Sequence, residues 1–140
     1  EQALAQDRFE EVMALEIEPA SASEALFLFD YPLAFGSLAR KKPGEPQTAE
    51  RFEIYIGGLE LANGFSELTD AAEQRRRFEK ENETRTRRGR APYPMPESFL
   101  DALSRMPESA GIALGVDRMA MLFTGASSID EVVAFTPEEL

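Results

Sequence analysis

The sequence contains no cysteine and no histidine, and these two absences exclude much of the chemistry that enzymes commonly use. Without cysteine the chain has no disulfide, no thiol nucleophile and no cysteine zinc site. Without histidine it has neither a serine–histidine–aspartate triad nor an imidazole metal ligand. Any catalysis must therefore rest on carboxylates, arginine, lysine, asparagine, backbone groups and a bound ion.

Long apolar runs are absent as well, since none approaches the ~20 residues that a membrane span requires. No signal peptide opens the chain, so we expect a cytoplasmic protein with no membrane partner. The 140 residues suffice for a single domain with one core, and we expect one domain over residues 1–140. Because residue 1 is Glu1 and not methionine, we expect the chain to be cut from something longer.

Positive charge is scarce, and the formal net charge of −11 disfavours general attraction to nucleic acid or anionic membranes. Over half of the basic residues lie between Arg75 and Arg90. This segment belongs to a predicted helix that begins at Asp70, with a D-x-x-E capping box, and stops at Gly89. A solvated helix face is the favoured interpretation. Binding of nucleic acid is the less favoured one, because no aromatic residues interleave as stacking platforms.

The remaining pattern predicts an α+β fold with a mostly antiparallel sheet flanked by helices. Helical spacing predicts helices over residues 2–17 and around residues 99–106. The segment from residue 36 to residue 48 reads as a solvated loop, and residues 132–135 as a short final strand. The strands of the main sheet are expected near residues 25–30, 51–56, 59–64 and 110–116.

The stretch ERFEIYIGGLELANGFSELTD, residues 50–70, contains two alternating runs joined by two glycines. Gly57 and Gly58 suit a type I′ hairpin turn, in which both central residues need positive φ. With that turn, Glu53 and Glu60 become diagonal neighbours on one face, roughly 7–8 Å apart at the backbone. Two carboxylates placed in this way either hold a divalent cation or repel each other in water.

Residues 111–125 read GIALGVDRMAMLFTG, in which small and apolar residues alternate. This predicts a strand with one apolar face and one nearly bare face that lets a ligand or another element approach the backbone. Asp117 is expected to cap a following helix, with Arg118 on its first turn. A helix N-terminus beside a guanidinium suits a phosphate, although packing and an ordinary salt bridge remain alternatives.

Together these two stretches resemble a known family. The run GIALGVDR is similar to motif 3 of class II aminoacyl-tRNA synthetases, and ERFEIYIGGLELANGFSEL resembles the preceding segment of the lysine-specific branch. The run ELANGFSELTDAAEQRRRFE, together with Ala113, resembles the elongation factor P–(R)-β-lysine ligase group most. The implied activity is ATP-dependent formation of an aminoacyl-adenylate and ligation to a lysine of elongation factor P. The implied partners are elongation factor P and (R)-β-lysine, in preference to α-lysine.

The resemblance also implies roles for single residues. Glu53 and Glu60 would hold Mg²⁺ against the phosphates of ATP, and Ile54 would contact the nucleotide through its backbone. Gly115 would lie under the adenosine. Arg118 would clamp the terminal phosphate and is the implied catalytic residue. The substrate amino groups would be received by a polar set with Ala113 at its floor: Glu60, Asn63 and Glu67.

Two expectations follow from the same comparison. Strict alternation turns Asn63 away from Glu60, so we expect a bulge or twist near residues 62–64 if Asn63 is to join the site. Motifs 1 and 2 are not recognisable, so the chain reads as the C-terminal part of a catalytic domain whose full-length form is a homodimer. We expect the isolated chain to be inactive.

Three alternatives remain open. A lysyl-tRNA synthetase that charges tRNA with α-lysine differs from the favoured interpretation only in substrate and acceptor. A non-catalytic binding module would keep the fold without the reaction. Nucleic-acid binding through the Arg75–Arg90 helix is disfavoured by the net charge.

Overall fold

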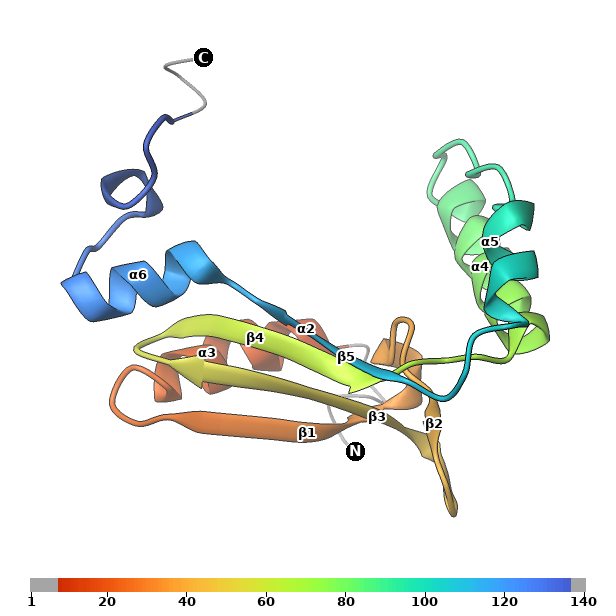
Figure 1. Ribbon diagram of the computed structural model, residues 1–140, viewed down its shortest axis with the longest axis horizontal. Coiled ribbons are helices and arrows are strands. Elements are labelled where there is room, and N and C mark those ends of the chain that lie inside the picture. Colours follow the sequence, from red (N-terminus) through yellow and green to blue (C-terminus); the bar gives the residue numbers. More distant parts are fainter. Residues whose placement is uncertain (1–7, 137–140) are drawn as a thin grey trace. The chain divides into compact units, whose positions relative to one another are not determined.

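The computed structural model describes residues 8–136, which form a five-stranded sheet with accompanying helices (Figure 1). Hydrogen-bonded neighbours follow the order β1-β3-β4-β5, and β2 pairs with β3 in antiparallel orientation. The strands are β1 (Leu26–Pro32), β2 (Lys41–Lys42), β3 (Glu45–Ile56), β4 (Leu59–Ser66) and β5 (Ala110–Leu114). The predicted α+β architecture is confirmed.

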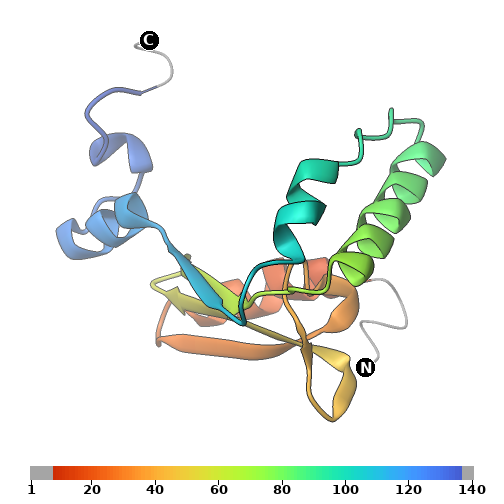
Figure 2. The same ribbon diagram turned by 45° about the vertical axis from the view of Figure 1, so that its right-hand side comes forward.

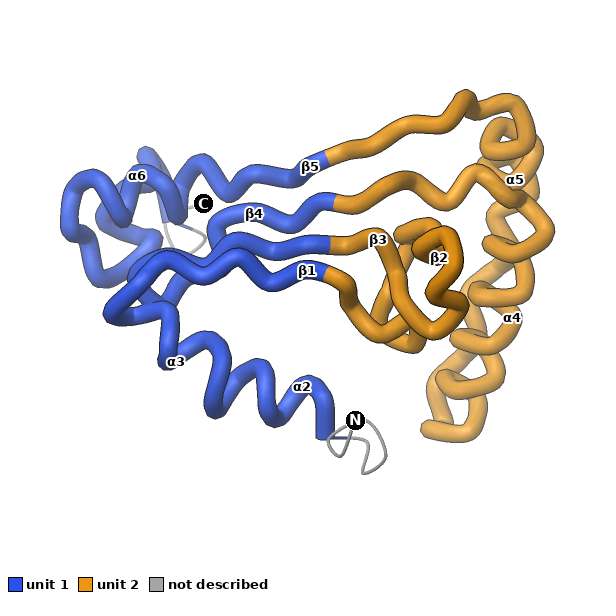
Figure 3. Tube along the Cα trace, turned by 90° about the horizontal axis from the view of Figure 1, so that it is seen from below, with its two compact units in different colours: residues 1–29, 52–64, 112–140 blue, residues 30–51, 65–111 orange. Residues whose placement is uncertain are grey.

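The described chain divides into two compact units, which are coloured separately in Figure 3. Unit 1 consists of residues 1–29, 52–64 and 112–140. Unit 2 consists of residues 30–51 and 65–111. Counted from the sequence, unit 1 has a formal charge of −12 and unit 2 of +1. The acidic character of the protein is therefore confined to unit 1.

The hairpin between β3 and β4 confirms the predicted type I′ turn, because φ is +62° at Gly57 and +78° at Gly58. An apolar face is expected to be the buried one, but along β3 the face that carries Glu53 and Tyr55 is more buried than the face that carries Phe52. Glu53 and Tyr55 are buried, with exposed fractions of 5% and 3%, whereas Phe52 is only half-buried. The acidic face of this strand thus lies inside unit 1.

Residues 36–48 were expected to form a loop, and this expectation is wrong. β2 and the start of β3 form a second hairpin, with Gly44 at φ +80° in its turn. The Lys42 Nζ lies 2.5 Å from Asp30 Oδ2 and 3.1 Å from Glu45 Oε1. Polar side chains dominate this hairpin, so hydrophobic alternation gave no signal for it. Its Lys42 pairs with Glu45 across the turn and with Asp30 of β1.

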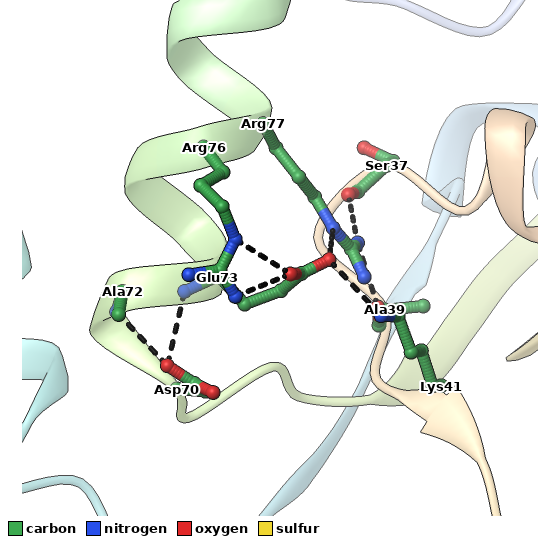
Figure 4. A network of polar contacts seen from close by, with 8 residues as sticks. All are labelled: Ser37, Ala39, Lys41, Asp70, Ala72, Glu73, Arg76 and Arg77. Atoms are coloured by element: carbon green, nitrogen blue, oxygen red, sulfur yellow. Dashed lines mark hydrogen bonds and ion pairs between the residues drawn. The ribbon is translucent and has the colours of Figure 1, made fainter. Parts of the chain in front are cut away.

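Helix α4 (Ala71–Arg87) begins and ends where its caps predict. The Asp70 Oδ1 accepts hydrogen bonds from the backbone N–H groups of Ala72 at 2.9 Å and Glu73 at 3.0 Å. Gly89 follows the helix with φ +70°. The reciprocal half of a capping box is not made, because the Glu73 carboxylate binds the guanidinium groups of Arg76 and Arg77 instead (Figure 4).

The Glu73 carboxylate is the centre of a polar network in unit 2. Arg77 Nη1 donates to the backbone carbonyls of Ser37 and Ala39 at 2.8 Å each, and Lys41 Nζ lies 3.6 Å from Glu73. The hydrogen bond from Arg76 is the largest cause that lowers the pKa of Glu73; burial opposes it, and the hydrogen bond from Arg77 and the charge of Lys41 add to the lowering. This network fastens α4 to the segment before β2.

Helix α5 (Glu97–Leu103) lies beside α4 (Figure 2). It buries Leu100 and Leu103, as the predicted short amphipathic helix requires. The rings of Phe78 and Phe99 are 6.1 Å apart between centroids, and Arg75 pairs with Glu97. These contacts join the two helices within unit 2.

Unit 1 begins with a continuous helical segment: α2 (Phe9–Val12), the π-helical turn η1 (Met13–Ile17) and α3 (Glu18–Ala20). The helix predicted over residues 2–17 is confirmed over residues 9–17, which the structure describes, and it continues one residue past Pro19. Leu4, part of the predicted helical pattern, lies outside the described residues. No helix in the described range 8–136 is long and apolar enough to cross a membrane.

The C-terminal part of unit 1 contains α6 (Val116–Thr124) and η3 (Ile129–Glu131). Gly115 is the N-cap of α6, so Asp117 lies in the first turn and is not the cap that we expected. Ser128 and Glu131 form a capping box at the start of η3. Residues 132–135 form turns and bends, so the predicted last strand is wrong.

Candidate functional site

The centre of the candidate site is a buried acidic face on the β3–β4 hairpin. Tyr55 Oη donates a hydrogen bond to Glu53 Oε2 at 2.5 Å. Burial is the largest cause that raises the pKa of Tyr55. This hydrogen bond and the negative charges of Glu53, Glu60 and Glu18 raise it further. The negative charges of three carboxylates therefore act on the phenol of Tyr55. A face with this electrostatic character favours a cationic ligand.

Arg118 is the basic residue that the structure brings to this face. Its Nη1 donates to the backbone carbonyl of Glu60 at 2.6 Å and lies 3.6 Å from Glu60 Oε2. The backbone N–H of Gly115 donates to Leu61 O at 2.8 Å, which ties the start of α6 to β4. Nearly half of the Arg118 side chain remains exposed, with a fraction of 47%. The guanidinium is thus held on one side and open on the other.

Asn63 has a buried acceptor that nothing in the described residues satisfies. Its Oδ1 has no hydrogen-bond partner, although the residue as a whole is only half-buried. An unpaired buried amide oxygen costs about 1–3 kcal/mol, so such an atom calls for a donor or a cation. β4 runs from Leu59 to Ser66, and Leu61 and Ala62 are both buried, so strict alternation of burial is broken just before Asn63. The bulge or twist expected near residues 62–64 stays a prediction.

Ile54, Ala113 and Glu67 complete the set predicted from the sequence. Ile54 is half-buried on β3, and Ala113 is exposed on β5. Glu67 belongs to unit 2, where its backbone N–H donates to Ser109 O at 2.9 Å. A Cβ built on Gly111 would lie 2.8 Å from Glu67 Oε1, so only glycine admits the carboxylate at this distance. The small residue on this face of β5 therefore lets the Glu67 carboxylate approach the backbone of Gly111 closely.

Sequence reasoning assigned no role to Tyr55. The signal that could have found it is simple, because residues two apart on a strand share a face. Tyr55 therefore had to lie beside Glu53. A tyrosine beside a buried carboxylate supplies the hydrogen bond that this charge needs.

A divalent cation would need oxygen ligands beyond the protein's own. Across the described residues, no group of three or more acidic side chains is arranged to hold a metal ion. The carboxylates of Glu53 and Glu60 are hard oxygen donors of the kind that Mg²⁺ prefers, and Mg²⁺ commonly keeps phosphate and water ligands in addition. The donor set thus fits Mg²⁺ carried by a polyphosphate. A surface hollow on α4 is lined by none of the candidate residues, but by Glu79, Asn82, Glu83, Thr86 and Arg87.

Comparison with known proteins identifies the family to which the chain belongs. The family model for tRNA synthetases class II (D, K and N) matches residues 5–139. This match covers nearly the whole sequence, and the chain belongs to that family.

Individual proteins similar to this chain share one name. The chain is 45% identical over 127 residues to proteins named elongation factor P–(R)-β-lysine ligase from Salmonella gallinarum, Salmonella heidelberg and Salmonella enteritidis. The alignments cover 89% of this chain and 39% of each relative. The chain thus spans well under half the length of the curated relatives that it matches.

Proposed function

We propose that this chain is part of an ATP-dependent ligase that activates (R)-β-lysine and transfers it to a lysine of elongation factor P. The observation that carries this proposal is the acidic face of Glu53, Glu60 and Tyr55 with Arg118 at its border. A substrate with two amino groups and one carboxylate needs anions around its amines. A polyphosphate needs a metal ion and a guanidinium. The relatives' name supports the choice of substrate and acceptor.

The proposed reaction has two steps. The carboxylate of β-lysine attacks the α-phosphorus of ATP, and pyrophosphate leaves with the bonding electrons. The amine of the acceptor lysine then attacks the acyl carbon of the adenylate, a proton is lost from nitrogen, and AMP leaves. No histidine is needed, because the attacking group is already an anion and the protein supplies position and charge.

Glu53 and Glu60 are proposed to bind Mg²⁺, which would neutralise the phosphate charge and orient the leaving pyrophosphate. Arg118, whose side chain is 47% exposed while its Nη1 donates to the carbonyl of Glu60, would bind the terminal phosphate. Ile54 and Gly115 would contact the nucleotide through their backbones. These assignments place the charged groups of the ATP site on β3, β4 and the first turn of α6.

Glu60 and Asn63 of unit 1 are proposed to receive the amino groups of the substrate. The same role for Glu67, which the resemblance implies, stays a prediction. The Asn63 Oδ1 is suited to this role because it is a buried acceptor without a donor. Ala113 would shape the floor of the pocket. We also propose that the full-length protein is a cytoplasmic homodimer, in keeping with the family.

The test compares Glu60→Gln with Glu24→Gln in the complete protein that contains this chain. Glu24 is an exposed acid of unit 1 outside the site, so it controls for the loss of one charge. Glu60→Gln keeps the backbone carbonyl that binds Arg118. We expect β-lysine-dependent ATP–pyrophosphate exchange to fall about 100-fold in Glu60→Gln, because a proposed ligand of Mg²⁺ and of a substrate amine loses its charge, and to persist in Glu24→Gln.

The same preparation separates the proposed function from its nearest alternative. The wild-type protein should attach (R)-β-lysine to elongation factor P and should use α-lysine less well. Charging of tRNA with α-lysine, without transfer to elongation factor P, would instead identify a lysyl-tRNA synthetase. Absence of any amino-acid-dependent exchange would indicate the non-catalytic alternative.

A further inference from the structure

The end of α4 carries arginines that form no ion pair with a carboxylate of the described residues. From Thr84 to Pro96 the sequence contains four arginines and no acidic residue. Earlier on the same helix, by contrast, arginines pair with Glu73 or Glu97. We use the name arginine cluster for the three exposed members, Arg87, Arg88 and Arg90. Within residues 8–136 none of the three makes an ion pair with a carboxylate.

The fourth arginine, Arg85, helps to hold the segment that follows the helix. Its guanidinium carbon lies 3.7 Å from the centroid of the Tyr93 ring, and its Nε donates to Ala91 O at 3.1 Å. Asn82 binds the backbone of Tyr93 twice: its Nδ2 donates to the carbonyl at 3.0 Å, and its Oδ1 accepts from the N–H at 2.8 Å. The segment is thus clamped back onto α4.

The glycine cap at the end of α4 fixes the backbone of Arg90, because Gly89 has φ +70° and its N–H donates to Thr86 O at 3.0 Å. The backbone N–H of Arg90 donates to Arg85 O at 2.9 Å, so Arg90 is held next to the last turn of the helix although it lies beyond it. Charges held in place before binding lose less conformational entropy when a partner arrives. The helix dipole accounts for Arg87 and Arg88 at the C-terminus of α4, and the glycine cap accounts for the backbone position of Arg90. Neither accounts for the clamp of Asn82 and Tyr93.

We propose that the arginine cluster is a docking surface for a carboxylate-bearing face of the acceptor protein. This inference rests on the proposed function, because it assigns a place on unit 2 where the protein acceptor is captured. Guanidinium groups bind carboxylates through paired hydrogen bonds, and positive patches accelerate encounter with negative ones.

A nucleic acid is a poorer fit to the arginine cluster. Binding of single-stranded nucleic acid relies on aromatic rings on which bases stack. In residues 84–96 the one aromatic ring is Tyr93, and the guanidinium of Arg85 covers one of its faces. A long polyanion would also meet the net charge of −11, whereas docking of a protein needs only a local match of charge.

The test measures two rates in the complete protein, with elongation factor P as the acceptor. One is ATP–pyrophosphate exchange, which needs no acceptor, and the other is transfer to subsaturating elongation factor P. The variant is Arg88→Glu with Arg90→Glu. Its matched control is Lys80→Glu with Arg105→Glu, which reverses two exposed charges of unit 2 outside the cluster.

We expect the ratio of transfer to exchange to fall about tenfold in the cluster variant, through a higher KM for elongation factor P, and to stay near the wild-type ratio in the control. The wild-type KM should rise with salt, and more steeply than that of the cluster variant. Asn82→Ala keeps every charge and releases the clamp. It should produce a smaller fall in the same ratio, which loss of charge alone would not predict.

The outcomes separate this inference from the proposed function. Equal ratios in the cluster variant and the control would overturn the docking surface and leave the ligase intact. The docking surface would also be refuted if the cluster variant lost tRNA binding while its KM for elongation factor P stayed unchanged. A wild-type protein that transfers nothing to elongation factor P would refute the proposed function and this inference together.

Discussion

Replacing Tyr55 by phenylalanine removes one hydroxyl from the centre of the acidic face and keeps the ring. The hydroxyl donates to Glu53, and both side chains are nearly inaccessible, with exposed fractions of 3% and 5%. Water therefore cannot readily replace the lost donor. A hydrogen bond to a charged group contributes about 1.5–3 kcal/mol, so we expect Tyr55→Phe to lower the free energy of unfolding by that amount near neutral pH.

The same substitution should change how stability depends on pH. In the folded state the pKa of Tyr55 is raised, chiefly by burial, so the folded protein holds the phenolic proton more tightly than the unfolded chain does. The stability from this group is complete below about pH 10, the pKa of an unperturbed tyrosine, and is lost as pH rises above it. In that range the wild type should lose about 1.4 kcal/mol more per pH unit than Tyr55→Phe.

The assay is denaturant unfolding of the complete protein from pH 8 up to the highest pH at which the protein is still folded, with tyrosinate absorbance measured in parallel. Tyr93→Phe is the matched control, because it makes the same chemical change on a side chain that is 62% exposed. Its effect should stay within about 0.5 kcal/mol at every pH. Parallel stability curves for wild type and Tyr55→Phe above pH 10 would refute the reasoning, as would ionisation of Tyr55 at an ordinary pKa.

Two further predictions concern stability. Gly57→Ala should destabilise more than Gly58→Ala: both glycines have positive φ, but the new methyl would lie 3.0 Å from Leu122 Cδ1 only at Gly57. Comparing the two midpoints of unfolding isolates this contact, and equal losses would contradict it. Glu73→Gln should destabilise at neutral pH, because the guanidinium of Arg76 lowers the pKa of Glu73. Its stability contribution is present above the unfolded pKa of 4.5 and fades as pH falls below it, so the wild-type and variant curves should converge in acid.

Features encoded by local chemistry were predictable from the sequence. The turn at Gly57 and Gly58 follows from the requirement for positive φ, and α4 follows from Asp70 at one end and Gly89 at the other. The hairpin of β2 and β3 was missed because ion pairs to Lys42 stabilise it. Such pairing depends on which charged groups meet in three dimensions, and hydrophobic periodicity does not report it.

In the candidate site, too, some features were predictable from local sequence and others depend on contacts in three dimensions. Alternation predicted that Glu53 and Glu60 share a face, and both contribute to the charge around Tyr55. It did not predict that this face is the buried one, because periodicity identifies residues that lie together without saying what covers them. The clamp of Asn82 and Tyr93 joins residues eleven apart through an amide and a backbone, and no sequence pattern indicates it.

The apolar face of β5 has a practical consequence for handling this chain. Ile112 and Leu114 are 59% and 49% exposed, and β5 stands last in the strand order of the described sheet. An apolar strand with an open edge is a template for pairing with other molecules. The net charge of −11 opposes such pairing at low ionic strength. Added salt screens that repulsion, so residues 1–140 prepared alone should self-associate more as salt is raised, and dilute, low-salt buffer is the better choice for their purification.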